Sequence, residues 1–203
     1  MSVELEPTDR VKLRRKAERG SYERATVNAI LDEALIAHVG FAIDGQTCVL
    51  PMTYARVDDV LYLHGAVANN MLKSLASGID VCVTVTLLDA IVLSRSAFHH
   101  SMNFRSVVVY GVATKVDSDD EKHVATRALV EHMVPGRSNE TRGPTPSELR
   151  KTLFVRVPID EASAKIRTGP PIEDPDDLAL PYWGGEIPIT LTRGEPVADE
   201  FVR

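Results

Sequence analysis

The segment from His64 to Lys73 has the composition of a phosphate-binding turn. His64 ends a predicted strand, the loop 65–70 follows, and the next residues predict a short helix. A helix N-terminus presents free N–H groups and a partial positive charge, which favours an anion at this place. Asn69, Asn70 and Lys73 would add side-chain donors. A simpler interpretation is also open, in which Asn69 only caps the helix and Lys73 is solvated.

A second group of polar side chains occupies residues 98–106, between two predicted strands. His99 and His100 form a pair that hints at a metal or haem, although one such pair is weak evidence. Asn103 and Arg105 straddle an aromatic residue and could hold a planar, anionic ligand. The alternative is a tight loop whose Asn and Ser side chains satisfy their own backbone.

The elements that must position these residues are mostly strands. Apolar stripes with a period near 3.6 predict helices from Arg24 to before His38 and over 119–133, and alternation predicts the strands. Asp44-Gly45 is a hairpin signal, and the segment 138–148 is a polar loop. The expected strands are 38–43, 46–57, 60–64, 79–88, 90–96, 104–116 and 152–159.

Pro51 interrupts the strand 46–57. Proline lacks the backbone N–H, so this strand is expected to be bulged or to lie at a sheet edge near residue 51. Because neighbouring strands form hairpins, the fold class is mainly β with peripheral α-helices, an antiparallel and nearly closed barrel in one domain.

Composition excludes several classes of function. The 203 residues are 44% hydrophobic and 26% charged, which is typical of a globular domain, and the net charge is −6. We therefore expect no nucleic-acid partner, since basic excess is lacking. No apolar run approaches the ~20 residues of a membrane helix, and the acidic N-terminus is unlike a signal peptide, so we expect no membrane and a cytoplasmic location. The basic stretch 10–19 is interpreted as a solvated arm, with a phosphate contact across a dimer as the alternative.

Motif searches exclude familiar nucleotide and metal sites. The chain contains no GxGxxG after a strand, no GxxxxGK[ST] and no GxSxG. Two cysteines, Cys48 and Cys82, cannot form the CxxC pairs of a zinc site and are expected to be small core residues. No metal ion is therefore expected.

Three blocks of sequence resemble a known family. They are LYLHGA…NNMLKSL (61–75), VCVTVTLLDAIVLSRSAFHHSMNFRSVVVYG (81–111) and EASAKIRTGPP (161–171). They are similar to the flavin-nucleotide-binding branch of the pyridoxamine 5'-phosphate oxidase-like proteins, which includes the nitroimidazole-resistance proteins. The resemblance implies an FMN-binding split β-barrel and a homodimer with FMN at the subunit interface. It further implies a basic arm at 1–23, the barrel domain at 24–170 and a Pro/Gly-rich tail at 171–203 that packs on the barrel.

The resemblance also implies a cofactor site. The phosphate turn would contain His64, Gly65, Asn69, Asn70 and Lys73, and a further strand start would close the pocket. The backbone of the interrupted strand would lie against the flavin ring, and Arg56 would contact phosphate or substrate. The remaining implied residues are Pro51, Met52, Thr53, Tyr54, Asn103, Phe104, Arg105 and Ser106. Candidates for proton delivery are His64, Tyr54, His99 and His100.

These observations favour an FMN-dependent oxidoreductase that acts on a small planar, nitroaromatic-like substrate with a separate reducing cofactor. The arginine-rich C-terminal signature of true pyridoxamine phosphate oxidases is missing, so vitamin B6 oxidation is not expected. Three alternatives remain open: a flavin sensor or store without turnover, a haem-binding or haem-degrading barrel with His64 or His99 as axial ligand, and a dimer module that binds no flavin.

Overall fold

The computed structural model describes residues 3–201 and contains four α-helices in that range. They are α1 (Arg24–Glu33), α2 (Asn70–Leu75), α3 (Asp119–Met133) and α4 (Pro146–Lys151). The strands are β1 (Gly20–Ser21), β2 (Ile36–Ile43), β3 (Gln46–Val57), β4 (Val60–Ala66), β5 (Ser77–Leu93), β6 (Ser101–Lys115), β7 (Thr152–Pro158), β8 (Glu161–Arg167) and β9 (Gly185–Pro188). No helix in the described range is long and apolar enough to cross a membrane.

The chain divides into two compact units. The first contains the described residues up to Leu87 together with 105–167, and the second contains 88–104 and the described residues from Thr168 onward. The long strands β5 and β6 each contribute to both units. Each unit is described separately below.

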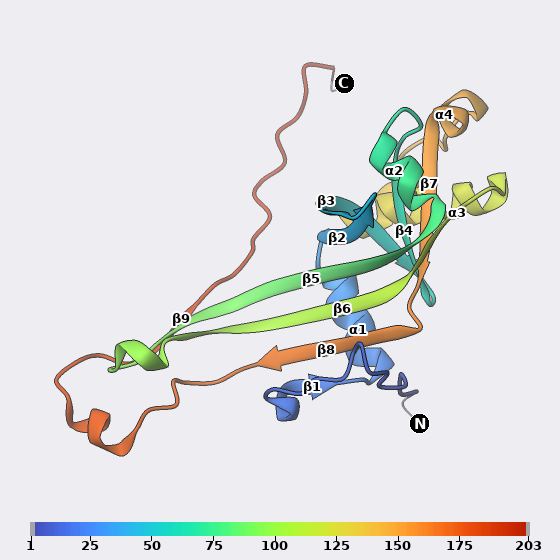
Figure 1. The fold of residues 1–203 in the computed structure, drawn as a ribbon. Coiled ribbons are helices and arrows are strands. Elements are labelled where there is room, and N and C mark those ends of the chain that lie inside the picture. Colours follow the sequence, from blue (N-terminus) through green and yellow to red (C-terminus); the bar gives the residue numbers. More distant parts are fainter. Residues whose placement is uncertain (1–2, 202–203) are drawn as a thin grey trace. The chain divides into compact units, whose positions relative to one another are not determined.

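Six strands of the first unit form a closed ring (Figure 1). Their order is β6-β7-β4-β3-β2-β5, and a further pairing of β5 with β6 completes the circle. The registers of β2 with β3, β3 with β4, β4 with β7 and β2 with β5 are all antiparallel. β8 pairs with β6, and β1 pairs with β8. The predicted fold class, a mainly β antiparallel split barrel with peripheral helices, is confirmed.

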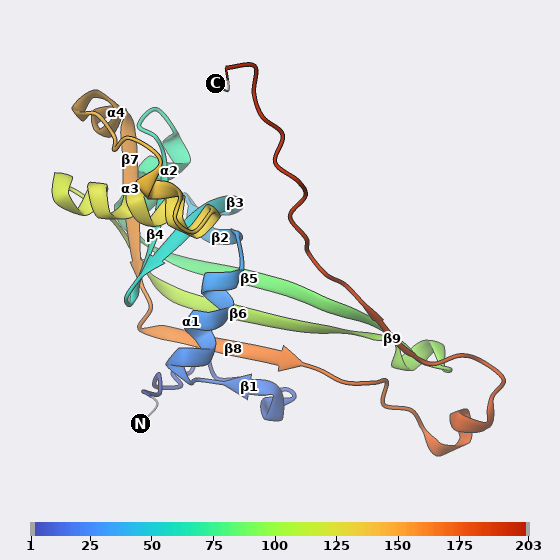
Figure 2. The same cartoon turned by 180° about the vertical axis from the view of Figure 1, so that it is seen from behind.

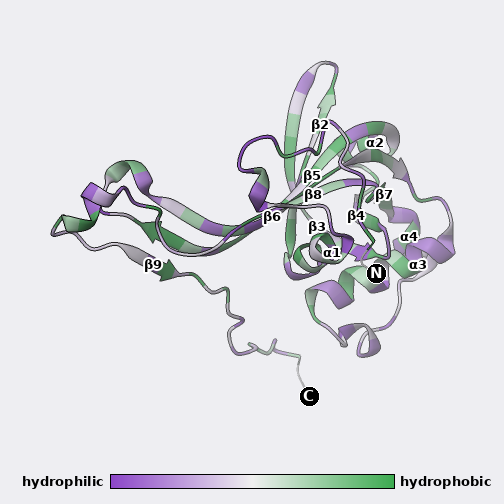
Figure 3. Ribbon diagram, turned by 90° about the horizontal axis from the view of Figure 1, so that it is seen from below, coloured by the Kyte–Doolittle hydropathy of each residue, from purple (hydrophilic) through white to green (hydrophobic). Residues whose placement is uncertain are grey.

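The interior of the ring is filled by alternating strand residues. Val81, Val83 and Val85 on β5 are fully buried, as the period of two requires, and Leu72 and Leu75 of α2 join the same core. A smaller cluster lies under α3 and includes Ala125 and Leu129. Figure 2 shows α3 against β3, and the mixed hydrophobic and hydrophilic colouring of α3 in Figure 3 is that of an amphipathic helix.

Several sequence predictions are confirmed by the structure. Strand β3 and helix α3 have the predicted limits, and Asp44 and Gly45 adopt the positive φ values (50° and 75°) that a tight hairpin turn needs. Pro51 lies at a sheet edge. The residues Gln46–Thr53 pair with β2, whereas the register of β4 with β3 begins only at Tyr54.

Other predictions need correction. The segments 79–88 and 90–96 are not separate strands, because β5 continues through Asp89 to Leu93. The expected loop 138–148 contains the start of α4, where Thr145 and Glu148 form a capping box with Pro146 in the first turn. Strands β1, β8 and β9 were not predicted. β9 is held by its register with β5, a long-range pairing that local sequence does not encode.

Candidate functional site

A cavity of about 360 Å³ opens beside the unpaired edge of β3. The missing N–H of Pro51 leaves this edge without a ladder, so backbone groups of β3 face the cavity rather than another strand. One wall comes from β3, and the opposite wall comes from the end of β4 and the start of α2. The lining residues are Leu50, Pro51, Met52, Thr53, His64, Asn69 and Leu72.

His64 is the one titratable side chain in this lining. Its ring is half-buried, and Nδ1 is buried without a hydrogen-bond partner in the described structure. Desolvation by burial lowers the pKa of His64, so the imidazole is neutral at pH 7. A neutral imidazole offers one donor and one acceptor, and the buried Nδ1 is an unused polar group of the kind that a ligand can satisfy.

The turn between His64 and Lys73 is built around a helix cap. Oδ1 of Asn69 accepts from the backbone N–H groups of Met71 (3.0 Å) and Leu72 (3.2 Å), and Nζ of Lys73 donates to Oδ1 of Asn70 (3.5 Å). The capping interpretation is therefore confirmed for Asn69, which also borders the cavity. Gly65 packs closely here, because a Cβ on it would lie 3.1 Å from Cδ2 of Leu72, which would have to move by a few tenths of an ångström.

A second cavity, of about 420 Å³, shares His64 with the first. It lies between α3, α4 and the start of β7, and much of its lining is apolar. Arg142 at this cavity is paired with Glu148 (2.7 and 2.8 Å). The lining residues are His64, Thr126, Leu129, Val130, Met133, Thr141, Arg142, Gly143, Pro144, Glu148, Leu149, Thr152 and Phe154.

The structure does not bring two of the predicted side chains to either cavity. Tyr54 is only 1% exposed and donates its hydroxyl to the backbone carbonyl of Leu31, and burial raises its pKa, so it is a poor proton donor. Arg56 makes a bidentate pair with Asp32 (2.8 and 2.6 Å) and also donates to the carbonyl of Asp58 (2.7 Å). These contacts hold its guanidinium away from the cavity lining.

Arg105 and Ser106, two more of the predicted residues, are the first residues of β6 that belong to the first unit. Arg105 forms a bidentate ion pair with Glu33 at the end of α1, and Oγ of Ser106 donates to the carbonyl of Lys165 (3.3 Å) on β8. Their side chains therefore join β6 to neighbouring elements of the barrel.

The remaining predicted residues belong to the second unit. Asn103 is buried and donates to Glu186 of β9, while Phe104 is half-buried. His99 contacts Asp174, with 3.2 Å between Nε2 and Oδ2, and Nδ1 of His100 is 3.0 Å from the carbonyl oxygen of Ser96.

Sequence reasoning missed part of both cavities. Leu50 and Leu72 were not among the predicted site residues, and Phe154 and Arg142 lie far from the predicted site in sequence. The TPSE capping-box pattern at 145–148 was the available signal for α4, the helix that forms one wall of the second cavity.

Comparison with known proteins identifies the family. The sequence profile described as pyridoxamine 5'-phosphate oxidase matches residues 23–166. The chain belongs to this family of flavin-type split barrels. A search of curated protein sequences gives no match.

Solved structures extend this likeness over almost the whole chain. The flavocytochrome Anf3 from Azotobacter vinelandii is 37% identical, with a TM-score of 0.89 over 96% of this chain and 91% of that one. A FAD and heme binding protein from Mycobacterium smegmatis is 33% identical, with a TM-score of 0.87 over 91% of each chain. A protein described as a 5-nitroimidazole antibiotic resistance protein from Bacteroides thetaiotaomicron shares the fold at 21% identity, with a TM-score of 0.60 over 72% of this chain and 86% of that one.

Proposed function

We propose that this protein binds a flavin nucleotide in the cavity beside β3 and acts as a flavin-dependent oxidoreductase. The observation that carries the proposal is the cavity itself, which combines the unpaired edge of β3 with the unsatisfied Nδ1 of His64. A flavin ring has apolar faces and a hydrogen-bonding edge. Met52 and Leu72 supply apolar contact, and the backbone of Pro51 and Thr53 supplies polar groups.

The residues of this chain would bind and orient the group rather than react with it. When bound, a flavin supplies one- or two-electron transfer. The edge of β3 would hold the ring, and neutral His64 would donate or accept one hydrogen bond at a fixed position. Asn69 caps two of the N–H groups at the start of α2, and its carbonyl accepts from a third, that of Lys73. The N–H of Asn70 would therefore be the one that faces the anionic phosphate.

Two relatives support this assignment because they exceed 30% identity over more than nine tenths of the chain. One is described as a flavocytochrome and the other as a FAD and heme binding protein. We infer from these two relatives that FAD is a candidate for the bound flavin, in addition to the FMN that the sequence resemblance implies. From the family resemblance we further propose that the protein is a homodimer and that it uses a reducing cofactor and a small planar substrate.

The test is an absorption spectrum of purified protein before and after incubation with FMN or FAD and desalting. We expect a retained flavin double band. Thr53→Tyr fills the cavity and should abolish retention, whereas Val49→Tyr, at an exposed position on the same strand outside the lining, should leave it intact. Equal retention in both variants, or none in the wild type, overturns the proposal.

Turnover is tested separately from binding. An oxidoreductase should lose its flavin absorbance when a nicotinamide donor is added without oxygen, and should regain it on addition of a nitroaromatic or quinone acceptor. A flavin that stays oxidised with every nicotinamide donor supports the sensor or storage function instead.

A second candidate function is haem binding in the larger cavity. That cavity is lined by Leu129, Met133 and Phe154 and shares His64, whose imidazole could serve as an axial ligand. The two relatives, a flavocytochrome and a FAD and heme binding protein, favour this candidate. Reconstitution with haemin should then give a Soret band. Its position should change in His64→Ala but not in the control His123→Ala. A change in His99→Ala alone would instead assign the axial ligand to the second unit.

A further inference from the structure

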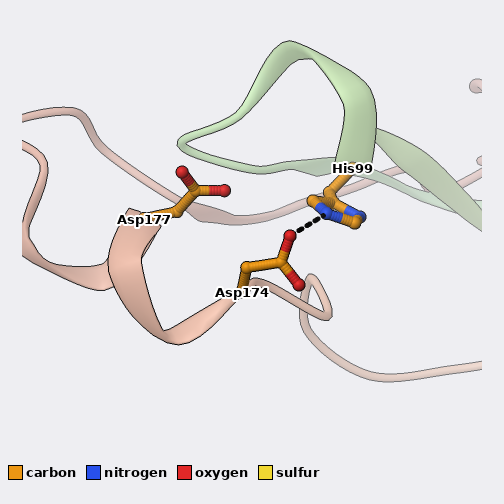
Figure 4. Close-up of side chains that lie close together, drawn as sticks. All are labelled: His99, Asp174 and Asp177. Atoms are coloured by element: carbon orange, nitrogen blue, oxygen red, sulfur yellow. Dashed lines mark hydrogen bonds and ion pairs between the residues drawn. The ribbon is translucent and has the colours of Figure 1, made fainter.

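Three metal-ligating side chains meet in the second unit (Figure 4). His99 ends the short 3₁₀ helix Ala97–His99, Asp174 precedes the 3₁₀ helix Pro175–Ala179, and Asp177 lies within it. One ligand atom from each side chain lies within 4.8 Å of the others. Seventy-five positions of sequence separate His99 from Asp174, so only the folded unit brings them together.

Contacts outside the cluster hold both segments in place. The carboxylate of Glu173, whose side chain is 3% exposed, accepts from the backbone N–H of Arg95 (2.7 Å) and from its guanidinium (2.6 Å). Oγ of Ser96 caps the helix that ends at His99 by accepting from the N–H of Phe98 (3.3 Å). The positions of His99 and Asp174 are therefore set by groups that are not themselves ligands.

No lysine or arginine among residues 3–201 pairs with the two carboxylates of the cluster. Within that range the carboxylate of Asp174 forms its ion pair with the imidazole of His99, and Asp177 forms none. The nearest arginine in sequence, Arg95, is engaged by Glu173. Two carboxylates beside an imidazole repel each other until a cation joins them.

We propose that His99, Asp174 and Asp177 bind a divalent transition-metal ion of the Zn²⁺ type. The distance of 3.2 Å between Nε2 of His99 and Oδ2 of Asp174 is close to the ~3.3 Å separation of two ligand atoms in a tetrahedral site with bonds of about 2.0 Å. Asp177 offers a carboxylate oxygen within 4.8 Å of these two ligand atoms. The imidazole selects transition metals over Mg²⁺ and Ca²⁺, which prefer oxygen ligands.

The bound ion would fasten the two 3₁₀ helices to each other. Three protein ligands leave one position of a tetrahedral ion for water. His99 lies in the segment after Arg95, and the two aspartates lie in the segment after Glu173, so the ion would join two segments that the Arg95–Glu173 pair already links. Because the ion binds only the folded arrangement, it should stabilise the unit by an amount that rises with the logarithm of its concentration above the Kd.

Equilibrium dialysis of the chelator-treated full chain against Zn²⁺, with metal analysis, tests the site. We expect one ion per chain. His99→Ala and Asp177→Asn should each weaken binding by at least about tenfold, since loss of an outer-shell partner alone costs about 10–100-fold. Asp176→Asn alters the neighbouring exposed acid and is the matched control, which should bind as the wild type does. Far-UV circular dichroism shows that each variant folds.

A second measurement distinguishes Zn²⁺ binding at this specific site from non-specific binding to the protein surface. Zn²⁺ should raise the thermal unfolding midpoint of the wild type and of Asp176→Asn, but not that of His99→Ala. Glu173→Gln, which removes the ion pair with Arg95 and no ligand, should weaken binding less than His99→Ala does. Binding that is equal in all variants, or absent from the wild type, overturns the proposal.

Discussion

The imidazole of His64 stacks on the ring of Phe154, with 6.2 Å between the ring centroids and an interplanar angle of 25°. The two residues are register partners in the antiparallel pair of β4 and β7. Their side chains therefore share one face of the sheet. This cross-strand pair buries part of His64 and places it at the boundary of the two cavities. The contact with Phe154 therefore accounts both for the desolvation of the His64 imidazole and for its position between the cavities.

Folding stability should depend on pH through His64. Burial lowers its pKa in the folded state below the ordinary value of 6.5, so the unfolded chain takes up a proton more readily. The contribution of neutral His64 is present above pH 6.5 and is lost as the pH falls through the folded-state pKa. Urea unfolding at pH 7.5 and 5.5 should show a smaller loss on acidification in His64→Gln than in the wild type. His123→Gln, on the exposed side of α3, serves as control, and an equal loss in all three proteins would contradict the assignment.

Tyr54 should matter for stability and not for cofactor retention. Tyr54→Phe leaves the buried carbonyl of Leu31 without its donor, which should cost about 1–3 kcal/mol in the free energy of unfolding. Flavin retention should be unchanged because the phenol does not line the cavity. Tyr182→Phe, at a position 63% exposed, should change neither quantity. A Tyr54→Phe variant of normal stability that loses flavin would restore the role predicted from sequence.

The two roles of Asn69 can be separated by two substitutions. Asn69→Ala removes the cap of α2 and should destabilise the fold by about 1 kcal/mol, whereas Asn69→Asp keeps a capping oxygen. If flavin phosphate binds at this helix start, the added negative charge of Asn69→Asp should weaken flavin affinity by about tenfold or more. Fluorescence titration with FMN and FAD measures the affinity, and urea unfolding measures the stability. An unchanged affinity in Asn69→Asp would place the phosphate elsewhere.

Arg56 should act as a structural residue. Its bidentate pair with Asp32 lies at the protein surface, where such a pair contributes about 0.2–1 kcal/mol. Arg56→Gln and Asp32→Asn should each lower stability within that range and leave flavin affinity unchanged. If Arg56→Gln alone weakened flavin binding, while Asp32→Asn did not, Arg56 would be a cofactor contact as the resemblance implied.

Local sequence was enough to predict much of the architecture. The hairpin at Asp44-Gly45, the edge position of Pro51 and the limits of α3 all depend on the conformational preferences of neighbouring residues. The same holds for the cap at Asn69, which needs only the three residues that follow it. The hairpin pattern of the strands predicted a nearly closed antiparallel barrel, and the family resemblance specified the split barrel.

Only the tertiary structure decided which predicted residues share a site. Pro51 and His64 meet because β3 and β4 form a hairpin whose ladder stops at Tyr54, and His64 faces two cavities because β7 places Phe154 beside it. Tyr54 and Arg56 look equivalent to their neighbours in sequence, yet a backbone carbonyl and Asp32 engage them. His99 and Asp174 are likewise joined by long-range folding. The sequence determined the conformations of short segments, because these depend on local torsions and hydrogen bonds. The contacts between distant side chains depend on strand register and packing, and these exist only once the whole fold has formed.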